Sequence, residues 1–361
     1  MSLHFEKVTI KSIQKETEDC VSIELDIPEV LTDTYSYKAG QHITVRAFIN
    51  GEEVRRSYSL CSAPLQNLWK VAVKKINGGL FSTYANEQLK AGDELEIMPP
   101  MGHFFIETNK AATNNYVAIA AGSGITPVIS LIKTILSEES GSNFTLIYGN
   151  KNRHSIIFKE ELEALKNRYM NRFNLIHVLS REKTDATMNS GRITPDKLEQ
   201  IHKLVDYKTA DAFFICGPEE MIFSSKQFFE NIGIDAAKIR FELFNASGKK
   251  EKSAVTERNK PVDDSGPKSN ITIKLDGRAF DFELPFSSEI SILDAALTQG
   301  ADLPFACKGG VCCTCKAKLV EGEIEMDVCY GLEHEEVEQG FILTCQSHPK
   351  TEKVIIDFDI K

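Results

Sequence analysis

Short apolar runs separated by Gly, Pro and Asn fill the first 110 residues of the chain. Strand-like runs are found at 21–27, 42–49, 69–76 and 94–98, and one helical stretch is found at 80–90. Short strands at this spacing are typical of a small antiparallel β-barrel. We therefore predict a barrel domain over residues 1–110.

Residues 111–245 alternate between strand-like and helical patterns. The expected strands are 116–121, 144–148, 173–179, 212–216 and 240–244, and the expected helices are 127–137, 158–169, 195–204 and 218–232. Repeated strand–helix units predict an α/β domain with a parallel sheet and right-handed crossovers. Ligands of such sheets bind at the carboxyl ends of the strands.

The remaining residues divide into a tether and a third domain. Residues 246–268 contain no aromatic residue and few aliphatic ones, so this stretch is predicted to be a flexible linker. The domain at 269–361 opens with a predicted hairpin, strands 271–275 and 279–284 around Asp276-Gly277, followed by a helix at 292–299.

Length and composition agree with a multidomain protein. A chain of 361 residues is too long for one ordinary core, and 42% apolar with 26% charged residues is normal for globular proteins. The start MSLHFEKVTI lacks the features of a secretory signal, and the most apolar run, 116–121, is far shorter than a membrane span. We expect a cytoplasmic protein with no stable membrane insertion.

Negative charge is concentrated in the last quarter of the chain. Residues 269–361 carry 17 acids and 8 Lys or Arg, a net charge of −9, whereas residues 1–245 carry 31 acids and 28 bases, a net of −3. This distribution argues against a nucleic-acid partner and favours docking to a basic protein surface. Residues 321–338 hold eight acids and no Lys or Arg, which indicates either a solvated face or a docking patch.

The cysteines cluster at the same end of the chain. Six of the nine lie at 307–345, and CKGGVCCTC places Cys307, Cys312 and Cys315 in a C-x4-C-x2-C pattern with Cys345 in a later LTCQSHP. This is the plant-type [2Fe–2S] spacing. The alternative is a zinc knuckle or unligated thiols, but zinc sites usually pair their ligands and Cys345 has no such companion.

Four further sequence motifs are found at the ends of predicted strands, where a turn or a helix follows. Glycines there permit tight turns and let backbone amides approach a phosphate at a helix N-terminus. The motifs are Arg56-Ser57-Tyr58-Ser59, Gly78-Gly79-Leu80-Phe81-Ser82, Gly122-Ser123-Gly124-Ile125-Thr126-Pro127 and Cys216-Gly217-Pro218-Glu219-Glu220-Met221.

With these motifs, residues 1–245 resemble the ferredoxin–NADP reductase superfamily and residues 269–361 resemble a plant-type ferredoxin. The domain order is similar to that of reductases serving phenylacetyl-CoA epoxidases, ketosteroid hydroxylases and fatty-acid desaturases. The resemblance implies a FAD-binding barrel, an NAD(P)-binding α/β domain, and an α+β (β-grasp) domain whose [2Fe–2S] cluster is held by Cys307, Cys312, Cys315 and Cys345.

The resemblance also implies roles at the flavin site. Arg56 would pair with the FAD pyrophosphate, Tyr58 would stack on the isoalloxazine, and Ser59 would hydrogen-bond near flavin N5. Ser57 belongs to the same motif, and the G-x-x-S element over Gly79, Leu80, Phe81 and Ser82 favours FAD over FMN, which has no pyrophosphate.

For the nicotinamide cofactor, the resemblance implies binding by Gly122, Gly124, Thr126 and Pro127 and by Cys216, Gly217, Pro218 and Met221. Cys216 would lie near the carbon that transfers hydride. Ser180-Arg181 resembles the pair that holds the adenosine 2′-phosphate, which favours NADPH, with NADH possible, and Lys151 and Arg153 could assist.

The predicted catalytic set is Ser59, Cys216 and Glu242, with Glu242 as a proton relay. Electrons are expected to pass from NADPH to FAD, then singly to the cluster and on to an oxygenase or desaturase, first of all a di-iron epoxidase of the phenylacetyl-CoA type. A reductase for a separate ferredoxin and a redox-sensing binding protein are the alternatives. A sensor would need an output domain, and no segment is left over for one.

Overall fold

The computed structural model describes residues 4–244 and 266–360. The chain forms two compact units, 5–243 and a C-terminal unit that begins at 244, and each has a hydrophobic core of its own. Most of the predicted linker, 246–268, lies outside the described residues, and its last residue, Lys268, begins the first strand of the C-terminal unit.

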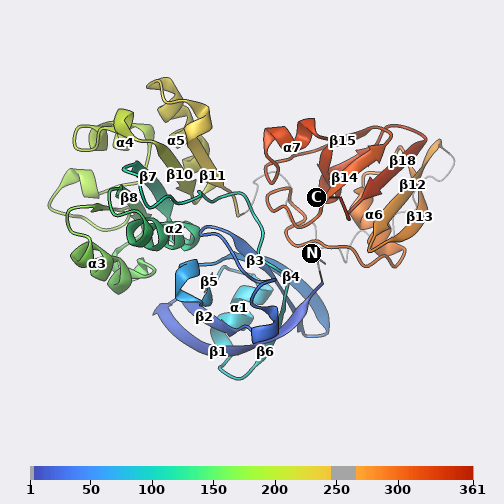
Figure 1. Ribbon diagram of the computed structural model, residues 1–361, viewed down its shortest axis with the longest axis horizontal. Coiled ribbons are helices and arrows are strands. Elements are labelled where there is room, and N and C mark those ends of the chain that lie inside the picture. Colours follow the sequence, from blue (N-terminus) through green and yellow to red (C-terminus); the bar gives the residue numbers. More distant parts are fainter. Residues whose placement is uncertain (1–3, 245–265, 361) are drawn as a thin grey trace. The chain divides into compact units, whose positions relative to one another are not determined.

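The first part of the N-terminal unit is an antiparallel barrel (Figure 1). Its six strands follow the order β4-β3-β6-β1-β2-β5, and a bridge between Leu60 and Val71 joins the end of β4 to β5. The elements are β1 (Glu6–Thr17), β2 (Cys20–Asp26), β3 (His42–Ile49), β4 (Glu52–Ser59), β5 (Trp69–Lys74), α1 (Leu80–Glu87) and β6 (Glu94–Ile97).

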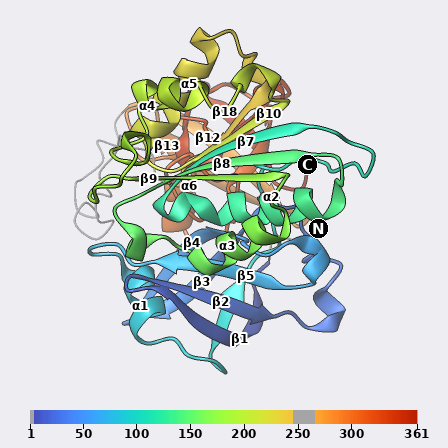
Figure 2. The same ribbon diagram turned by 90° about the vertical axis from the view of Figure 1, so that its left-hand side faces the viewer.

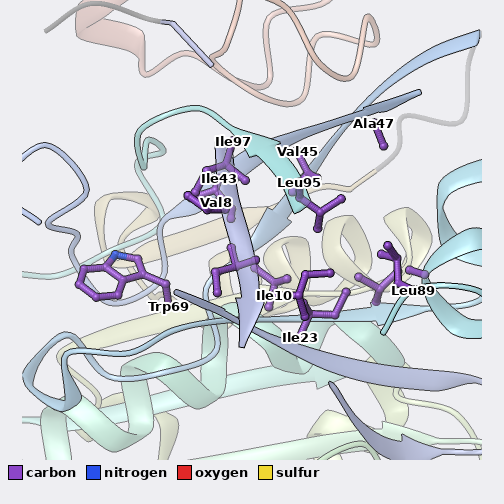
Figure 3. Close-up of a cluster of buried hydrophobic side chains, with 14 of the residues drawn as sticks. Val8, Ile10, Ile23, Ile43, Val45, Ala47, Trp69, Leu89, Leu95 and Ile97 are labelled. Atoms are coloured by element: carbon purple, nitrogen blue, oxygen red, sulfur yellow. The ribbon is translucent and has the colours of Figure 1, made fainter. Parts of the chain in front are cut away.

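Alternation of side chains along these strands fills the barrel with aliphatic residues. Val8 and Ile10 of β1, Ile23 of β2 and Ile43 of β3 are each at most 2% exposed. Figure 3 shows them gathered with neighbours from the other strands. Strands β1 and β4 were not predicted, because their exposed faces carry so many charged residues that the apolar face is hidden in the sequence.

The second part of the same unit is a five-stranded, wholly parallel sheet of order β11-β10-β7-β8-β9. Figures 1 and 2 show α2 and α3 on one face of this sheet and α4 and α5 on the other. The elements are β7 (Asn115–Ala121), α2 (Ile125–Glu138), β8 (Asn143–Asn150), α3 (Lys159–Arg168), β9 (Phe173–Leu179), α4 (Pro195–His202), β10 (Ala212–Cys216), α5 (Glu219–Asn231) and β11 (Ile239–Glu242).

This arrangement confirms the predicted α/β domain. Both faces of the sheet are covered, so β7 and β10 are continuous buried runs and not alternating ones. The strand order reverses between β7 and β10, since the chain leaves β7 towards β8 and β9 on one side and later returns to β10 and β11 on the other. Ligands of parallel sheets bind at such a reversal.

The C-terminal unit is an α+β domain around a mixed sheet of order β13-β12-β18-β14-β16. The predicted hairpin is confirmed, and its turn residues Asp276 and Gly277 have positive φ values of 51° and 69°. The elements are β12 (Lys268–Leu275), β13 (Arg278–Pro285), α6 (Ile292–Thr298), β14 (Lys316–Glu321), β15 (Ile324–Met326), α7 (His334–Glu338), β16 (Phe341–Leu343), β17 (Ser347–Pro349) and β18 (Lys353–Asp357).

The helices of the described residues are all too short or too polar to cross a membrane.

Candidate functional site

Two loops meet where the order of the parallel sheet reverses. The loop after β7 carries Gly122 and Gly124, and the loop after β10 carries Gly217. Gly122 has a φ of +54°, which favours glycine, and its carbonyl accepts a hydrogen bond of 2.9 Å from the hydroxyl of the buried Tyr148. The 14-residue helix α2 begins directly after this loop, so backbone amides and the helix N-terminus face the same point.

Gly124 lets the two loops pack together. A Cβ at this position would lie 2.1 Å from the carbonyl oxygen of Cys216 and 2.8 Å from the amide nitrogen of Gly217. Thr126 is buried and donates from its hydroxyl to the carbonyl of Ser123 at 3.1 Å, which closes the first turn. Gly124 therefore lets the loop after β7 pack directly against the loop after β10.

The second loop is equally close-packed. A Cβ on Gly217 would come within 2.7 Å of the Met221 methyl group and 3.1 Å of the Ala121 Cβ. Pro218 caps α5 in an extended conformation. The motif thus runs from Cys216, the last residue of β10, through Gly217 and Pro218 to Met221 in the first turn of α5, beside the glycine loop.

The three predicted catalytic residues come together from distant parts of the sequence. The Ser59 hydroxyl, at the end of β4, donates to Oε2 of Glu242, at the end of β11, over 3.0 Å. Glu242 stands opposite Cys216 in the register of β11 and β10. A carboxylate that accepts from a hydroxyl in this way can hold or pass a proton.

A fourth residue, His42, joins this group and was not predicted. It lies opposite Ser59 in the register of β3 and β4, and its Nδ1 is 3.6 Å from Oε1 of Glu242. The Glu242 and His42 side chains are only 12% and 7% exposed. No motif in the sequence signals His42, because its place beside Glu242 follows from strand pairing.

Cys216 is a neutral thiol in this setting. The residue is fully buried, and burial raises its pKa well above the usual range, with the nearby Glu242 carboxylate acting in the same direction. It can therefore contribute shape and packing at the strand end, but it is not a thiolate nucleophile at neutral pH.

The predicted flavin strand presents alternating side chains. Arg56 and Tyr58 lie on one face of β4 and Ser57 and Ser59 on the other. The Tyr58 ring is 5.3 Å from that of Phe81 in α1, and burial raises the pKa of its phenol. The Ser57 hydroxyl is buried and has no hydrogen-bond partner among the described residues. Because an unsatisfied buried hydroxyl is costly, a polar group of bound FAD fits this strand.

The G-x-x-S element forms the start of α1, as predicted. Gly78 has a φ of +74°, and a Cβ on Gly79 would lie 2.4 Å from the Ser82 hydroxyl and 2.5 Å from a carbon of Ile76. The Ser82 hydroxyl accepts from the Ile76 amide at 3.2 Å. The turn is thus a glycine cradle at a helix N-terminus, which suits a pyrophosphate. Phe81 is buried beneath it, whereas Leu80 is 42% exposed.

The loop after β9 carries the predicted 2′-phosphate residues. Ser180 and Arg181 are exposed, and among the described residues the Arg181 side chain has no ion pair or hydrogen bond. Arg153 is held by Glu182, which accepts from its amide at 2.8 Å and from its Nε at 2.5 Å. Arg181 is therefore available to bind an anion, as is the exposed Lys183 of the same loop, while the charge of Arg153 is already neutralised by Glu182.

Lys74 is a second residue that sequence reasoning missed. It ends β5 of the barrel, and its Nζ would lie 4.0 Å from a Cβ placed on Gly122. Asp19 is its partner at 3.6 Å. An ammonium at this distance can approach a phosphate held by the glycine loop, but in the sequence Lys74 is only one of two lysines ending a strand.

The four predicted cluster ligands lie together in the C-terminal unit as two pairs. The Cys312 thiol donates to Cys307 Sγ over 3.1 Å, and this bond lowers the pKa of Cys307 to about 7. The Cys315 thiol donates to Cys345, which lowers the pKa of Cys345 and raises that of Cys315.

Pairing of the thiols fits a two-iron cluster, in which each iron takes two cysteines. Within residues 4–244 and 266–360, no group of three or more His, Cys, Asp or Glu side chains is arranged to hold a metal ion. The amide of Gly309 also donates to Cys307 Sγ at 3.3 Å, as backbone N–H groups do around cluster sulfurs.

The acidic segment 321–338 is partly neutralised by lysines from outside it. Glu321 pairs with Lys353, Glu325 with Lys350 and Glu336 with Lys316. The excess charge counted along the sequence is therefore larger than the charge this surface presents. Glu323, Glu333, Glu335 and Glu338 remain exposed.

Family models match each of the three predicted domains. Residues 7–106 match the oxidoreductase FAD-binding domain, residues 118–227 the oxidoreductase NAD-binding domain, and residues 273–350 the 2Fe-2S iron-sulfur cluster binding domain.

Curated relatives match along the whole chain. The chain is 42% identical over 358 residues to a component of the 1,2-phenylacetyl-CoA epoxidase of Escherichia coli (strain K12), covering 99% of this chain and 98% of the relative. It is 32% identical to the ferredoxin reductase component of 3-ketosteroid-9-alpha-monooxygenase from Rhodococcus rhodochrous, covering 97% and 96%.

Among solved structures, phthalate dioxygenase reductase has the same fold over 98% of both chains, with a TM-score of 0.60 and 23% identity. A ferredoxin NADP+ reductase from Neisseria gonorrhoeae covers 66% of this chain, with a TM-score of 0.57 and 22% identity.

Proposed function

The chain belongs to the family of reductases that combine FAD-binding, NAD-binding and [2Fe–2S] ferredoxin domains, and we propose that it supplies electrons to the oxygenase of a phenylacetyl-CoA epoxidase. The observation that supports this acceptor is the 42% identity to the epoxidase component across nearly all of both chains. Identity to ketosteroid monooxygenase reductases is lower, at 30% to 32%, over 97% to 99% of this chain.

The family fixes the general reaction. Electrons pass from NAD(P)H through FAD to the [2Fe–2S] cluster. Bound FAD accepts two electrons together and releases them one at a time, which is the chemistry needed between a nicotinamide and a one-electron cluster.

We assign the residues of this chain as follows. Arg56 and the amides of the Gly79–Ser82 turn hold the FAD pyrophosphate, and Tyr58 supports its ring system. The glycine loop at 122–124 holds the nicotinamide diphosphate, with Lys74 as an added cation. Ser59 and Glu242 hold the proton that must leave when the flavin is reoxidised, and the 3.0 Å bond between them supports this role.

We propose NADPH as the preferred donor. Arg181 is exposed and has no side-chain partner among the described residues, so it is available for a 2′-phosphate. Glu182 would repel such a phosphate, but Arg153 occupies its carboxylate. The ratio of kcat/KM values for NADPH and NADH tests this preference.

The acceptor is tested by reconstitution. The purified chain is mixed with NADPH, phenylacetyl-CoA and the oxygenase component of a phenylacetyl-CoA epoxidase, and epoxide formation is measured against NADPH consumed. A parallel reaction contains a ketosteroid monooxygenase oxygenase and its steroid. Coupled turnover with the first oxygenase alone supports the proposal, and turnover with the second alone would reassign the acceptor.

The order of electron flow is tested at the cluster. Cys312→Ser removes one ligand and should abolish reduction of cytochrome c, a one-electron acceptor, while NADPH-dependent ferricyanide reduction through FAD continues. Equal loss of both activities in a folded, FAD-containing variant would contradict the assigned order.

The two alternative functions predict different results in the same experiments. A redox-sensing protein would show no coupled turnover with any oxygenase. A reductase for a separate ferredoxin would retain its physiological activity in Cys312→Ser. A cytoplasmic location follows from the proposed acceptor pathway, and fractionation of cells producing the chain would test it.

A further inference from the structure

Helix α2 is attached to the flavin barrel by two buried side chains. The Ser130 hydroxyl donates to the carbonyl oxygen of Ser62 over 2.6 Å. One turn later, Lys133 Nζ donates to the carbonyl oxygen of Cys61 over 2.8 Å. Ser130 is fully buried and Lys133 is 9% exposed. Both bonds cross from the NAD-binding domain to the segment that follows β4.

The burial of Lys133 requires a physical explanation, because lysine is among the residues least often buried in proteins. Lys133 is paired with Glu161 of α3 at 2.7 Å and has the Phe158 ring 5.9 Å away. The Glu161 side chain is 40% exposed, so this ion pair reaches the surface and contributes little to stability. Stability alone therefore does not account for a charged group here, whereas a directional bond to one particular carbonyl does.

The accepting segment is itself firmly held by the barrel. The Ser62 hydroxyl lies 2.8 Å from the hydroxyl of Tyr37 and donates to the Leu68 carbonyl at 2.6 Å. The Cys61 thiol donates to the Lys70 carbonyl at 3.1 Å. The carbonyls that Ser130 and Lys133 contact are thus fixed relative to the flavin strand.

These two hydrogen bonds connect the segment next to the proposed flavin site with the helix next to the proposed nicotinamide site. Cys61 and Ser62 follow Ser59, the last residue of β4, by two and three residues, so they lie directly after the strand that carries the proposed flavin residues. On the other side, α2 starts at Ile125, directly after the glycine loop that faces the nicotinamide diphosphate. A helix rises about 1.5 Å per residue, so Lys133 lies about 12 Å along a rigid rod from that loop.

We propose that Ser130 and Lys133 are positioning residues for hydride transfer: they hold the nicotinamide-binding helix at a fixed place on the flavin barrel. In that step the C–H bond at nicotinamide C4 breaks, and its hydrogen and electron pair pass to flavin N5. Neither side chain touches the reacting atoms. The proposal depends on electron transfer from NAD(P)H to FAD and not on which oxygenase accepts the electrons.

The test is Lys133→Met in the full chain, followed by anaerobic stopped-flow reduction of the flavin with NADPH. A misplacement of about 1 Å can cost about a hundredfold in rate, so we expect flavin reduction to slow by about ten- to a hundredfold. The NADPH dissociation constant should change little, since the glycine loop itself is intact. The charge-transfer absorbance between nicotinamide and flavin should weaken, and Lys133→Arg should restore part of the rate.

Lys197→Met is the matched control. Lys197 is a lysine of α4 that is 8% exposed, and its Nζ bonds the Thr187 carbonyl and Gln200 Oε1, each at 2.9 Å, within the NAD-binding domain. It should leave the rate of flavin reduction near that of the unaltered chain. Equal slowing in both lysine variants would overturn the proposal, because it would reduce the effect to a general loss of stability.

Ser130→Ala is the second test of the positioning role, and it is used if Lys133→Met loses FAD or fails to fold. It removes one hydroxyl and leaves the lysine in place, so the chain should fold, bind FAD and show slower flavin reduction with a weakened charge-transfer band. A folded Lys133→Met or Ser130→Ala chain that reduces its flavin at the unaltered rate would overturn the proposal.

Discussion

Replacing Gly124 by alanine adds a single methyl group at the point where the loops after β7 and β10, which we propose bind the nicotinamide cofactor, touch. Gly124 has φ −61° and ψ −7°, which any residue can adopt, so the substitution introduces no backbone strain of its own. The new Cβ would instead lie 2.1 Å from the Cys216 carbonyl oxygen, 2.5 Å from its carbonyl carbon and 2.8 Å from the Gly217 amide nitrogen.

The size of the effect follows from these distances. Non-bonded contacts of a carbon atom are most favourable at about 3.5 Å, so the loops must separate by roughly 1.4 Å to relieve the closest contact, at 2.1 Å. All three neighbours are backbone atoms and cannot rotate away. A shift of that size between groups that align reactants can lower the rate about a hundredfold. Overpacking should also cost about 1–3 kcal/mol of unfolding free energy in the N-terminal unit.

The assay is anaerobic reduction of the flavin by NADPH, with FAD content and the EPR signal of the dithionite-reduced cluster as checks. Gly124→Ala should bind FAD, keep the cluster signal and lose most of its rate of flavin reduction. Gly149→Ala is the control: its Cβ would lie 3.0 Å from the end of the Ile193 side chain, which can move, and 3.6 Å from the Ala121 Cβ, an ordinary van der Waals contact. A Gly124→Ala chain with unchanged rate and NADPH affinity would refute the assigned contact between the loops.

Three further predictions follow from single residues. Arg181→Ala should raise the KM for NADPH far more than that for NADH in steady-state assays; equal effects would remove its 2′-phosphate role. Cys216 should resist iodoacetamide at pH 8 while exposed Cys329 reacts, as followed by mass spectrometry, because burial raises the pKa of Cys216 well above its usual range; rapid labelling in the folded chain would contradict this. Backbone N–H groups of Gly277 and Asp276 lower the pKa of Asp359, so their stabilisation is fully present above the ordinary aspartate pKa and is lost as the pH falls below it, through the lowered pKa of the folded state. Asp359→Asn should therefore flatten the acid dependence of C-terminal unfolding, measured by thermal melts between about pH 2 and 6, and an unchanged slope would count against the turn contact.

The surface charge of the acidic segment 321–338 could not be judged from the sequence alone. Eight acids without a Lys or Arg between 321 and 338 suggest a strongly negative surface. Lys316, Lys350 and Lys353 lie outside that range, yet the folding of β14, β17 and β18 sets them against three of the acids. Local composition counts charges along the chain, whereas the field at a surface depends on charges that are close in space.

Motifs that are local in sequence could be predicted from the sequence alone. The cysteine spacing, the glycine turns and the strand–helix alternation each depend on a few neighbouring residues, because a turn, a helix start or a cluster loop is built from one short segment. The domain types therefore followed from the sequence, and the four cysteines that we propose as cluster ligands were identified from the same spacing. Strand β1 could not be predicted from the sequence. Its alternation of buried and exposed residues is defined only when the barrel closes and one face of the strand points inwards.

Only the tertiary structure could decide which of these segments meet. Ser59 and Glu242 are 183 positions apart and share a hydrogen bond, and His42 joins them through strand register. In the sequence, nothing distinguishes Lys133 from other lysines in helices. Only the tertiary structure shows that its Nζ donates to the carbonyl oxygen of Cys61. Neither pairing leaves a periodic trace, because periodicity reports which face of an element is buried and not what that face touches.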